Sequence, residues 1–276
     1  MAGKAAPRIL VIGAHPDDCE IKCGGTAILW KKLGFTVRFV SATNGCSGHQ
    51  SMTSAELAAR RKIEAANAAK VIGIESQVLD HTDGSLEPTL ANRKALIALI
   101  RQFNPDLILT HRPNDYHPDH RYTSQLVQDS AFSVTVPKIV PEVPPLRRNP
   151  TVMYLSDGFQ KPIPFRPDIV VGIDEVLEQK VDMLHCHVSQ FYEWLPWLDH
   201  EEDAIPKSDK ARREWVKKKR MPLDISIATR FRETLNTLYG RKTGSKFKYA
   251  EGFEACEYGG PLTPEKVKLL FPFVKK

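Results

Sequence analysis

The sequence predicts an α/β fold in which a mostly parallel, Rossmann-like sheet carries helices on both faces, followed by a C-terminal extension. Two observations carry this prediction. The first 130 residues alternate short β-branched or apolar runs with longer amphipathic segments, as repeated strand–helix units do. The chain of 276 residues is 42% hydrophobic, which is enough to bury a full core. We expect one domain over residues 1–276, with its core over 7–190 and peripheral elements over 191–276.

Six short apolar runs are expected to form strands. The first four alternate with helical segments, which predicts a parallel sheet in the order 3-2-1-4. The last two follow a segment whose five prolines predict a loop over residues 131–150. The six strands are expected at residues 8–12, 36–41, 77–79, 106–110, 152–155 and 168–173.

Capping and turn residues mark the expected helices. Thr53 and Glu56 form a capping-box pattern before a helical run that ends near Gly73. Two further helices are expected over residues 90–103 and 175–188.

Charge and hydropathy restrict the partners that we expect. The formal net charge is +6, and much of the excess lies in residues 207–220. Only Trp215 interleaves these basic residues, so we interpret them as a solvated helix face and expect no nucleic-acid partner. No apolar run approaches the roughly 20 residues of a membrane helix, and we expect a cytoplasmic protein without a membrane partner. Trp194 and Trp197 leave open a homo-oligomer contact or a platform for a sugar.

Imidazole and carboxylate groups follow two strands that this order makes neighbours. Residues 13–18 (GAHPDD) follow the first strand, and residues 111–120 (HRPNDYHPDH) follow the fourth. Ligands bind outside the carboxyl ends of such strands. A catalytic zinc ion takes three protein ligands, commonly imidazoles with a carboxylate. We therefore expect a metal site formed by His15, Asp18 and His120; the same donor set also suits Fe²⁺ or another divalent metal.

A dinucleotide site at the first loop is the alternative that we exclude. The loop joins a strand to a helix and begins with Gly13, but the G-x-G-x-x-G pattern is absent. Two carboxylates at the start of the helix would also repel a pyrophosphate.

The motifs A-H-P-D-D (residues 14–18) and H-P-D-H (residues 117–120) resemble the LmbE/PIG-L family of zinc-dependent N-acetylglucosaminyl deacetylases. Weaker resemblances lie at residues 61–64, 83–86, 187–190 and 249–253, whereas residues 131–165 and 191–245 match nothing in the family pattern. The resemblance implies that His15, Asp18 and His120 bind Zn²⁺ and that Asp17 is the general base. It also implies that His117 stabilises the oxyanion or protonates the leaving amine, and that Asp119 orients an imidazole.

The resemblance implies three substrate-binding residues, which are Arg61, Asp83 and His187. Each has a structural alternative. Arg61 has Arg60 as its neighbour, and the sequence leaves open which of the two reaches the site. Asp83 follows the third strand toward the same crevice, and His187 is otherwise a structural histidine at the end of a helix.

These residues predict a metal-dependent N-deacetylase acting on a small amino-sugar conjugate that contains N-acetylglucosamine, with release of acetate and the free amine. Zinc lowers the pKa of its water to roughly 7 and polarises the amide carbonyl. The alternatives are a different acyl amide substrate at the same metal and a non-catalytic sugar-binding protein. The presence of Asp17 argues against the binding protein, which has little need of a base beside the metal. The aglycone is not specified by any motif.

Overall fold

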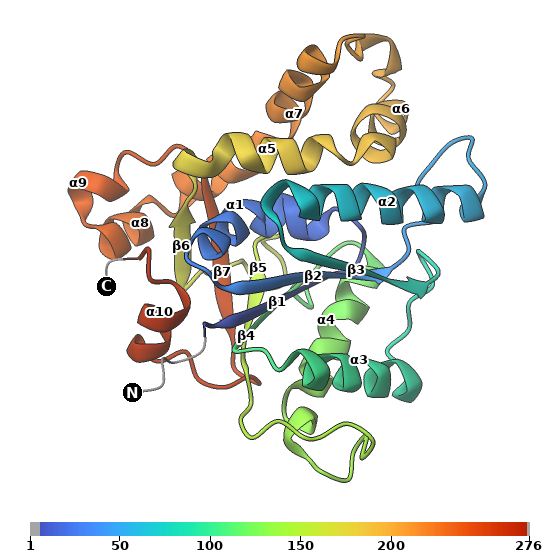
Figure 1. The fold of residues 1–276 in the computed structure, drawn as a ribbon. Coiled ribbons are helices and arrows are strands. Elements are labelled where there is room, and N and C mark those ends of the chain that lie inside the picture. Colours follow the sequence, from blue (N-terminus) through green and yellow to red (C-terminus); the bar gives the residue numbers. More distant parts are fainter. Residues whose placement is uncertain (1–5, 275–276) are drawn as a thin grey trace.

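The computed structural model describes residues 6–274 and contains a seven-stranded sheet in the order β3-β2-β1-β4-β5-β7-β6 (Figure 1). Strands β1 to β5 pair in parallel, whereas β7 is antiparallel to both β5 and β6. The expected order 3-2-1-4 is confirmed, and each of the six expected strands is present within a few residues. The strands are β1 (Arg8–Gly13), β2 (Thr36–Thr43), β3 (Glu75–His81), β4 (Leu107–Thr110), β5 (Thr151–Leu155), β6 (Ile169–Gly172) and β7 (Ala250–Cys256).

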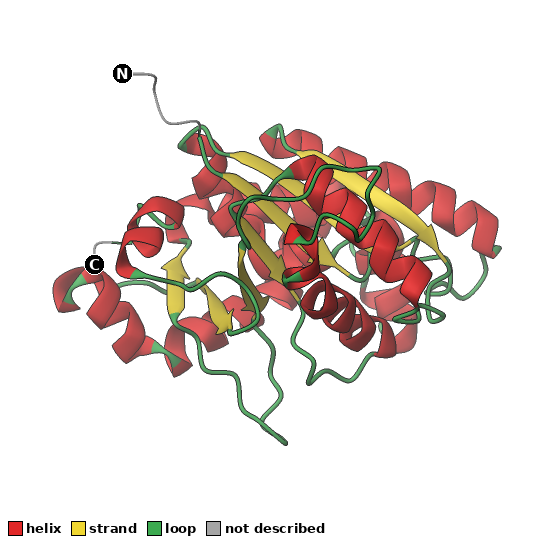
Figure 2. Ribbon diagram, turned by 90° about the horizontal axis from the view of Figure 1, so that it is seen from below, coloured by secondary structure: helices red, strands yellow, loops and turns green. Residues whose placement is uncertain are grey.

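Helices cover both faces of this sheet (Figures 1 and 2). In Figure 1, α1, α2 and α5 lie on one face, and α3 and α4 lie on the other. The longer helices are α1 (Asp18–Lys32), α2 (Ser54–Ile72), α3 (Leu90–Phe103), α4 (Pro118–Ala131), α5 (Leu177–His185), α7 (Asp209–Arg230), α8 (Arg232–Tyr239) and α10 (Pro264–Leu270). The short ones include α6 (Leu195–Leu198), α9 (Arg241–Gly244) and the π-helical turn η3 (Ser189–Trp194).

Strand β1 divides the core into two clusters. Ile9 and Val11 point into the cluster beneath α1 and α5, whereas Leu10 and Ile12 point into the cluster beneath α3 and α4. Successive side chains of a strand point to opposite faces, so a fully apolar strand requires helices on both sides. The run RILVI is therefore the sequence signature of this layered arrangement.

The expected helix boundaries are confirmed where a cap defines them. The Thr53 hydroxyl oxygen accepts a hydrogen bond from the amide of Glu56, and the Glu56 carboxylate accepts one from the amide of Thr53. The helix α2 then ends at Gly73, which has φ +68° in the left-handed region that glycine adopts without steric cost. These bonds fix where α2 begins and ends.

The expectation that all of residues 191–276 lie outside the core is wrong for β7. This strand inserts between β5 and β6 and has four fully buried residues at its start. Its sequence, AEGFEAC, contains two glutamates and a glycine, which are depleted in strands. The residues of β7 therefore form only a weak strand pattern, although the strand lies in the interior of the sheet.

Glu251 of β7 belongs to a buried ionic network that ties the sheet to three helices. It accepts hydrogen bonds from the amides of Gly25 and Thr26 in α1, at 2.9 and 2.7 Å. It also lies 2.8 Å from the Lys180 ammonium of α5, which in turn contacts Asp224 of α7 at 2.9 Å. Lys180 is 0% exposed, so its charge depends on these two carboxylates.

Lys180→Met is expected to lower the free energy of unfolding by about 3–5 kcal/mol, because it leaves two buried carboxylates without a counter-charge. Urea denaturation measures the change. Lys62→Met on the exposed face of α2 is the matched control and should stay within about 0.5 kcal/mol of the parent. Equal stability of the two variants would contradict this account of the network.

Among the described residues, 6–274, none of the helices combines the length and the apolar character needed to cross a membrane.

Candidate metal centre

The loop after β1 is shaped by hydrogen bonds to Asp18. The Asp18 Oδ2 atom accepts hydrogen bonds from the amides of Ala14 (3.0 Å) and His15 (2.8 Å), which holds the carboxylate against the end of the strand. Gly13 has no space for a side chain, because a Cβ there would lie 2.7 Å from the Asp18 Cβ. The chain therefore turns tightly enough for His15 and Asp18 to face one point.

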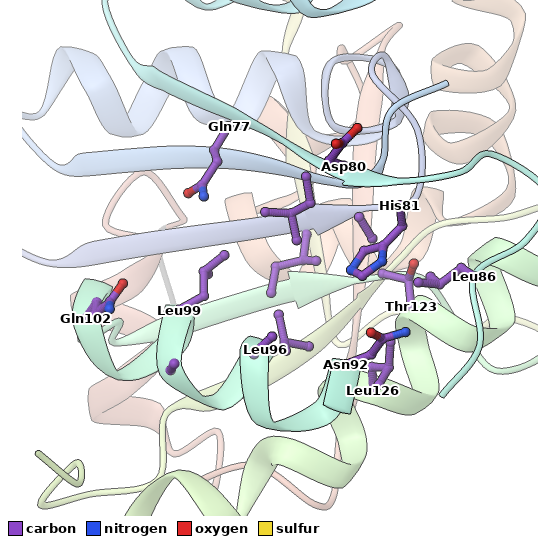
Figure 3. A pocket seen from close by; sticks show the side chains of 15 residues that line it. Gln77, Asp80, His81, Leu86, Asn92, Leu96, Leu99, Gln102, Thr123 and Leu126 are labelled. Carbon is purple, nitrogen blue, oxygen red and sulfur yellow. The ribbon is translucent and has the colours of Figure 1, made fainter. Parts of the chain in front are cut away.

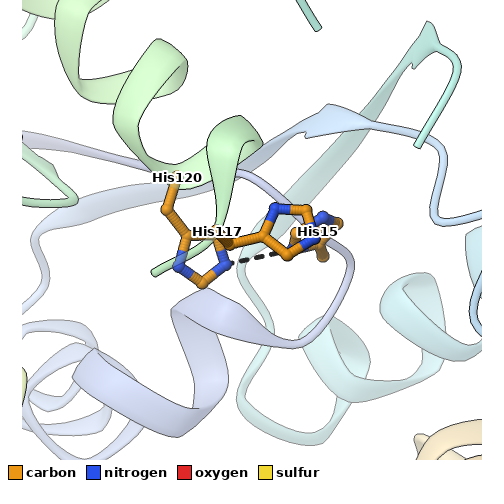
Figure 4. A group of neighbouring side chains, drawn as sticks. All are labelled: His15, His117 and His120. Atoms are coloured by element: carbon orange, nitrogen blue, oxygen red, sulfur yellow. Dashed lines mark hydrogen bonds between the residues drawn. The ribbon is translucent and has the colours of Figure 1, made fainter. Parts of the chain in front are cut away.

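The second motif begins α4. His117 is the N-cap residue, and its Nδ1 accepts a hydrogen bond from the amide of Asp119 at 3.1 Å. Pro118 is the first helical residue, where its missing N–H costs nothing. His120 therefore lies in the first turn, as expected, and its ring approaches His15 (Figure 4).

The three predicted metal ligands converge on one point. His15 Nδ1 lies 3.2 Å from His120 Nε2 and 3.5 Å from Asp18 Oδ2, and His120 Nε2 lies 3.5 Å from Asp18 Oδ2. Tetrahedral zinc with bonds of roughly 2.0–2.2 Å places neighbouring donor atoms about 3.3–3.6 Å apart. The spacing of these donor atoms fits zinc.

The opposite nitrogen of His15 is held by two carboxylates. His15 Nε2 lies 3.3 Å from Asp119 Oδ2 and 3.2 Å from Asp83 Oδ1. Asp119 is itself fixed by the amides of Gly84 (2.7 Å) and Leu86 (3.3 Å). Such outer carboxylates set the tautomer and orientation of a metal-binding histidine. Asp119 is thus placed to orient an imidazole, and Asp83 touches the same ring as well as lining the cavity.

Asp17 is paired with the arginine that the sequence left ambiguous. Its Oδ2 lies 3.1 Å from Arg61 Nη2, and the Arg61 side chain is only 3% exposed. The guanidinium also donates to the carbonyls of Pro16 (3.0 Å) and Gly45 (3.3 Å). Arg61 therefore reaches the site and positions Asp17. Arg60 points elsewhere.

Two side chains near the motif residues lie away from the cavity. Arg60 forms hydrogen bonds of 2.7 and 2.6 Å with the two carboxylate oxygens of Glu193. His187 is 0% exposed, lies 3.5 Å from Glu20, and is not part of the cavity wall among the described residues. This placement does not support substrate binding by His187 and agrees with its structural alternative.

The site opens into a cavity of about 460 Å³. Five of its lining residues were singled out in the two motifs or the loop after β3. The rest of the wall includes side chains from η3, α6 and α7, which the sequence left without a catalytic assignment. The polar and aromatic lining residues include His15, Asp17, Asp18, Asp83, His117, Arg61, Tyr116, Gln190, Trp194 and Arg220.

Trp194 and Arg220 come from the segment that matched no family pattern. Trp194 stacks on Trp197 with ring centroids 5.3 Å apart, and Trp194 is the ring that lines the cavity. Arg220 lies in the basic run that we interpreted as a solvated face. That interpretation is wrong for Arg220, because α7 turns this side chain into the cavity wall while its neighbours Lys218 and Lys219 remain exposed.

His111, directly after β4, contacts two of the predicted ligands, His120 and Asp18. Its ring stacks on His120 with centroids 4.0 Å apart, and its Nε2 accepts a hydrogen bond from the Ala14 amide at 2.9 Å. Burial, together with the nearby His120, lowers the pKa of His111 to about 3, so the ring is neutral. Because His111 Nε2 also lies 3.1 Å from Asp18 Oδ2, the residues Asp18, His111 and His120 form a second donor group.

Burial and charge shift the titration of the site in opposite directions. Burial raises the pKa of Asp17, and Arg61 partly offsets this. Burial also opposes ionisation of Asp18, but His120 and His111 outweigh it and hold the pKa well below its usual value. For His15, burial lowers the pKa, yet hydrogen bonds to carboxylates such as Asp119 outweigh it and raise the pKa well above its usual value. The lowered pKa of Asp18 keeps this predicted ligand ionised.

A second cavity of about 460 Å³ lies between β3 and α3, on the face of the sheet that α3 and α4 cover (Figure 3). Its wall is mainly aliphatic and includes Leu79, Leu96 and Leu99, with His81 beside them. Among the described residues, this wall contains none of the predicted metal ligands.

The chain is similar to a known protein family and to several known proteins. A family model described as PIG-L, GlcNAc-PI de-N-acetylase, matches residues 10–131, which include the three predicted metal ligands. The diacetylchitobiose deacetylase of Thermococcus kodakarensis is 30% identical over 206 residues, which cover 69% of this chain and 74% of the relative.

One similar protein has a different stated activity. The 4-oxalmesaconate hydratase of Pseudomonas putida is 24% identical over 194 residues, which cover 67% of this chain and 74% of the relative. The solved structure of N,N'-diacetylchitobiose deacetylase from Pyrococcus horikoshii has a TM-score of 0.71 at 23% identity, covering 92% of this chain and 85% of that one, and shows the shared fold. With both motif loops at adjacent strand ends and a relative of this similarity, the chain belongs to the PIG-L/LmbE family.

Proposed function

We propose that this protein is a zinc-dependent hydrolase that removes the N-acetyl group from a small molecule containing N-acetylglucosamine, releasing acetate and the free amine. One observation carries the proposal: three donor atoms at zinc spacing lie at a cavity whose wall includes two of the ligands, His15 and Asp18, and an additional carboxylate, Asp17. The deacetylase named among the relatives supports the choice of an acetamido sugar.

A zinc ion at this point would supply a Lewis acid and would lower the pKa of a coordinated water to roughly 7. His15, Asp18 and His120 would hold it. Asp119 and Asp83 would keep the His15 ring in the orientation that presents Nδ1 to the metal, because both carboxylates lie at its Nε2.

Asp17 would act as the general base. Its Oδ2 is engaged by Arg61, which leaves Oδ1 to accept a proton from the attacking water. Arg61 is buried and makes two further bonds to backbone carbonyls, so the carboxylate is held in one orientation. A positioned base of this kind contributes about 10²–10⁴ in rate.

His117 would stabilise the oxyanion through Nε2. Its Nδ1 accepts a hydrogen bond from the Asp119 amide, so in this arrangement the ring proton is on Nε2. A neutral ring with Nε2–H is a hydrogen-bond donor to a developing negative charge. This favours oxyanion stabilisation over proton donation to the amine, the two roles that the resemblance left open.

A second candidate is the addition of water to an unsaturated carboxylate at the same metal, which the hydratase relative favours. Both reactions require an activated water and a base, so the metal site alone does not separate them. Release of acetate is specific to the deacetylase.

Removal of the metal tests the proposed function. We expect the purified protein to release amine and acetate from N,N'-diacetylchitobiose or a related acetamido sugar, as measured with fluorescamine and an acetate assay. Dialysis against a chelator should lower the rate by roughly 100-fold or more, and one equivalent of Zn²⁺ should restore it. Absence of amine release by zinc-loaded protein from every acetamido sugar tested would reject deacetylation, and full activity of metal-free protein would reject the role of the metal.

A further inference from the structure

Arg220 brings a positive charge from α7 into the wall of the cavity that contains the metal-ligand cluster. The helix supplies the wall together with η3, opposite the strand-end loops. The guanidinium lies over the Phe191 ring, with its carbon 4.9 Å from the ring centroid. The contact gives the side chain an apolar support on one side and leaves its polar edge for the cavity.

The guanidinium of Arg220 lacks a partner in the described part of the chain. Its Nε atom is buried without a hydrogen bond, and no carboxylate of the described residues forms an ion pair with it. The other arginine of the cavity, Arg61, differs because it forms an ion pair with Asp17 and donates to two backbone carbonyls. Burial lowers the pKa of Arg220, while Asp17 and Asp199 oppose that shift.

Arg220 remains charged despite this burial, because the ordinary pKa of an arginine lies above about 12. Partial burial of an unpaired charge is unfavourable, and the penalty is relieved when an anion binds. The planar guanidinium also matches the two oxygens of a carboxylate or phosphate. The free protein therefore holds the cation in an arrangement that a bound anion would complete.

We propose that Arg220 binds an anionic group, a carboxylate or a phosphate, on the part of the substrate beyond the acetamido sugar. The inference rests on the proposed function. An acetamido group is uncharged, and the metal end of the cavity is lined by Asp17, Asp18 and Asp83, which repel an anion. The charged group therefore belongs to the aglycone, and Arg220 makes this protein selective for anionic conjugates.

A matched set of substrates tests the assignment. The propyl glycoside of N-acetylglucosamine is neutral, the carboxymethyl glycoside is similar in size and anionic, and the phosphoethyl glycoside separates phosphate from carboxylate recognition. The parent enzyme should prefer at least one anionic glycoside. Arg220→Gln should lower kcat/KM for that glycoside by about 10- to 100-fold, mainly through KM, and change the propyl glycoside by less than about 3-fold.

Two further variants separate recognition from helix structure. Lys218→Gln removes one charge from the exposed side of the same helix and should retain the preference. Arg220→Lys keeps the charge but lacks the planar pair of donors, and it should retain part of the preference for the anionic glycoside. Equal losses on the neutral and anionic glycosides in Arg220→Gln would assign a structural role to Arg220 and overturn the inference, as would a parent enzyme without any preference.

Calorimetry with the deacetylated carboxymethyl and phosphoethyl glycosides gives a readout that does not depend on turnover. The dissociation constant of the preferred compound should rise by about 10-fold or more in Arg220→Gln and stay unchanged in Lys218→Gln. If the proposed function is wrong, the parent releases no acetate from any of the glycosides. Failure of the inference appears as parent and Arg220→Gln binding the anionic compounds equally, including the case in which neither binds them.

Discussion

Asp17→Asn is expected to lower kcat for amine release by about 10²–10⁴-fold while the protein keeps its metal. The amide has nearly the shape of the carboxylate and retains an oxygen that accepts the hydrogen bond from Arg61, which lies 3.1 Å from Asp17 in the parent. It has no basic oxygen for the proton of the attacking water. The expected loss is therefore one of chemistry, with little change in folding or in metal content.

Metal analysis and steady-state kinetics on the same preparation check this result. Asp203→Asn, at an exposed aspartate outside the cavity, is the matched control and should retain full activity. Undiminished turnover in Asp17→Asn would remove Asp17 as the base. Loss of the metal together with turnover would instead show that Asp17 holds the ligand loop, which its neighbour Asp18 shares.

The sequence predicted those parts of the site that depend on local motifs and on one topological rule. His15 and Asp18 are three residues apart, and parallel pairing of β1 with β4 brings His120 to them. The capping box of α2 and the proline at the start of α4 are likewise local signals. Strand pairing in a parallel sheet thus converts two local motifs into one non-local cluster.

The residues that the sequence did not predict depend on contacts between distant segments. Arg220 is one of several basic residues on α7, and only the packing of that helix decides which of them faces the cavity. The contact of Asp83 with His15 likewise depends on how the loop after β3 folds over the strand ends. In strand β7, Glu251 forms an ion pair with Lys180 and accepts hydrogen bonds from two amides of α1. These contacts offset the weak strand propensity of its sequence.

His120→Ala is expected to abolish metal binding at stoichiometric level, and turnover with it. The variant removes one of three donor atoms that lie within 3.5 Å of one another, and the remaining pair cannot complete the tetrahedral set. Loss of a residue that only orients a ligand costs roughly 10- to 100-fold in metal affinity, so loss of the ligand itself should exceed that. The thermal stabilisation that added Zn²⁺ gives the parent should also disappear, because it requires binding to the folded state.

A parallel pair of variants decides between two donor groups, His15 with Asp18 and His120, and His111 with Asp18 and His120. His15→Ala should lose the metal as His120→Ala does, whereas His111→Phe should keep it, since the His111 Nε2 is already engaged by the Ala14 amide and the ring serves as a stacking surface for His120. Stoichiometric zinc in His120→Ala would reject both groups. Zinc retained in His15→Ala but lost in His111→Phe would assign the metal to Asp18, His111 and His120, and His15 would then be a hydrogen-bonding neighbour of the site held by Asp83 and Asp119.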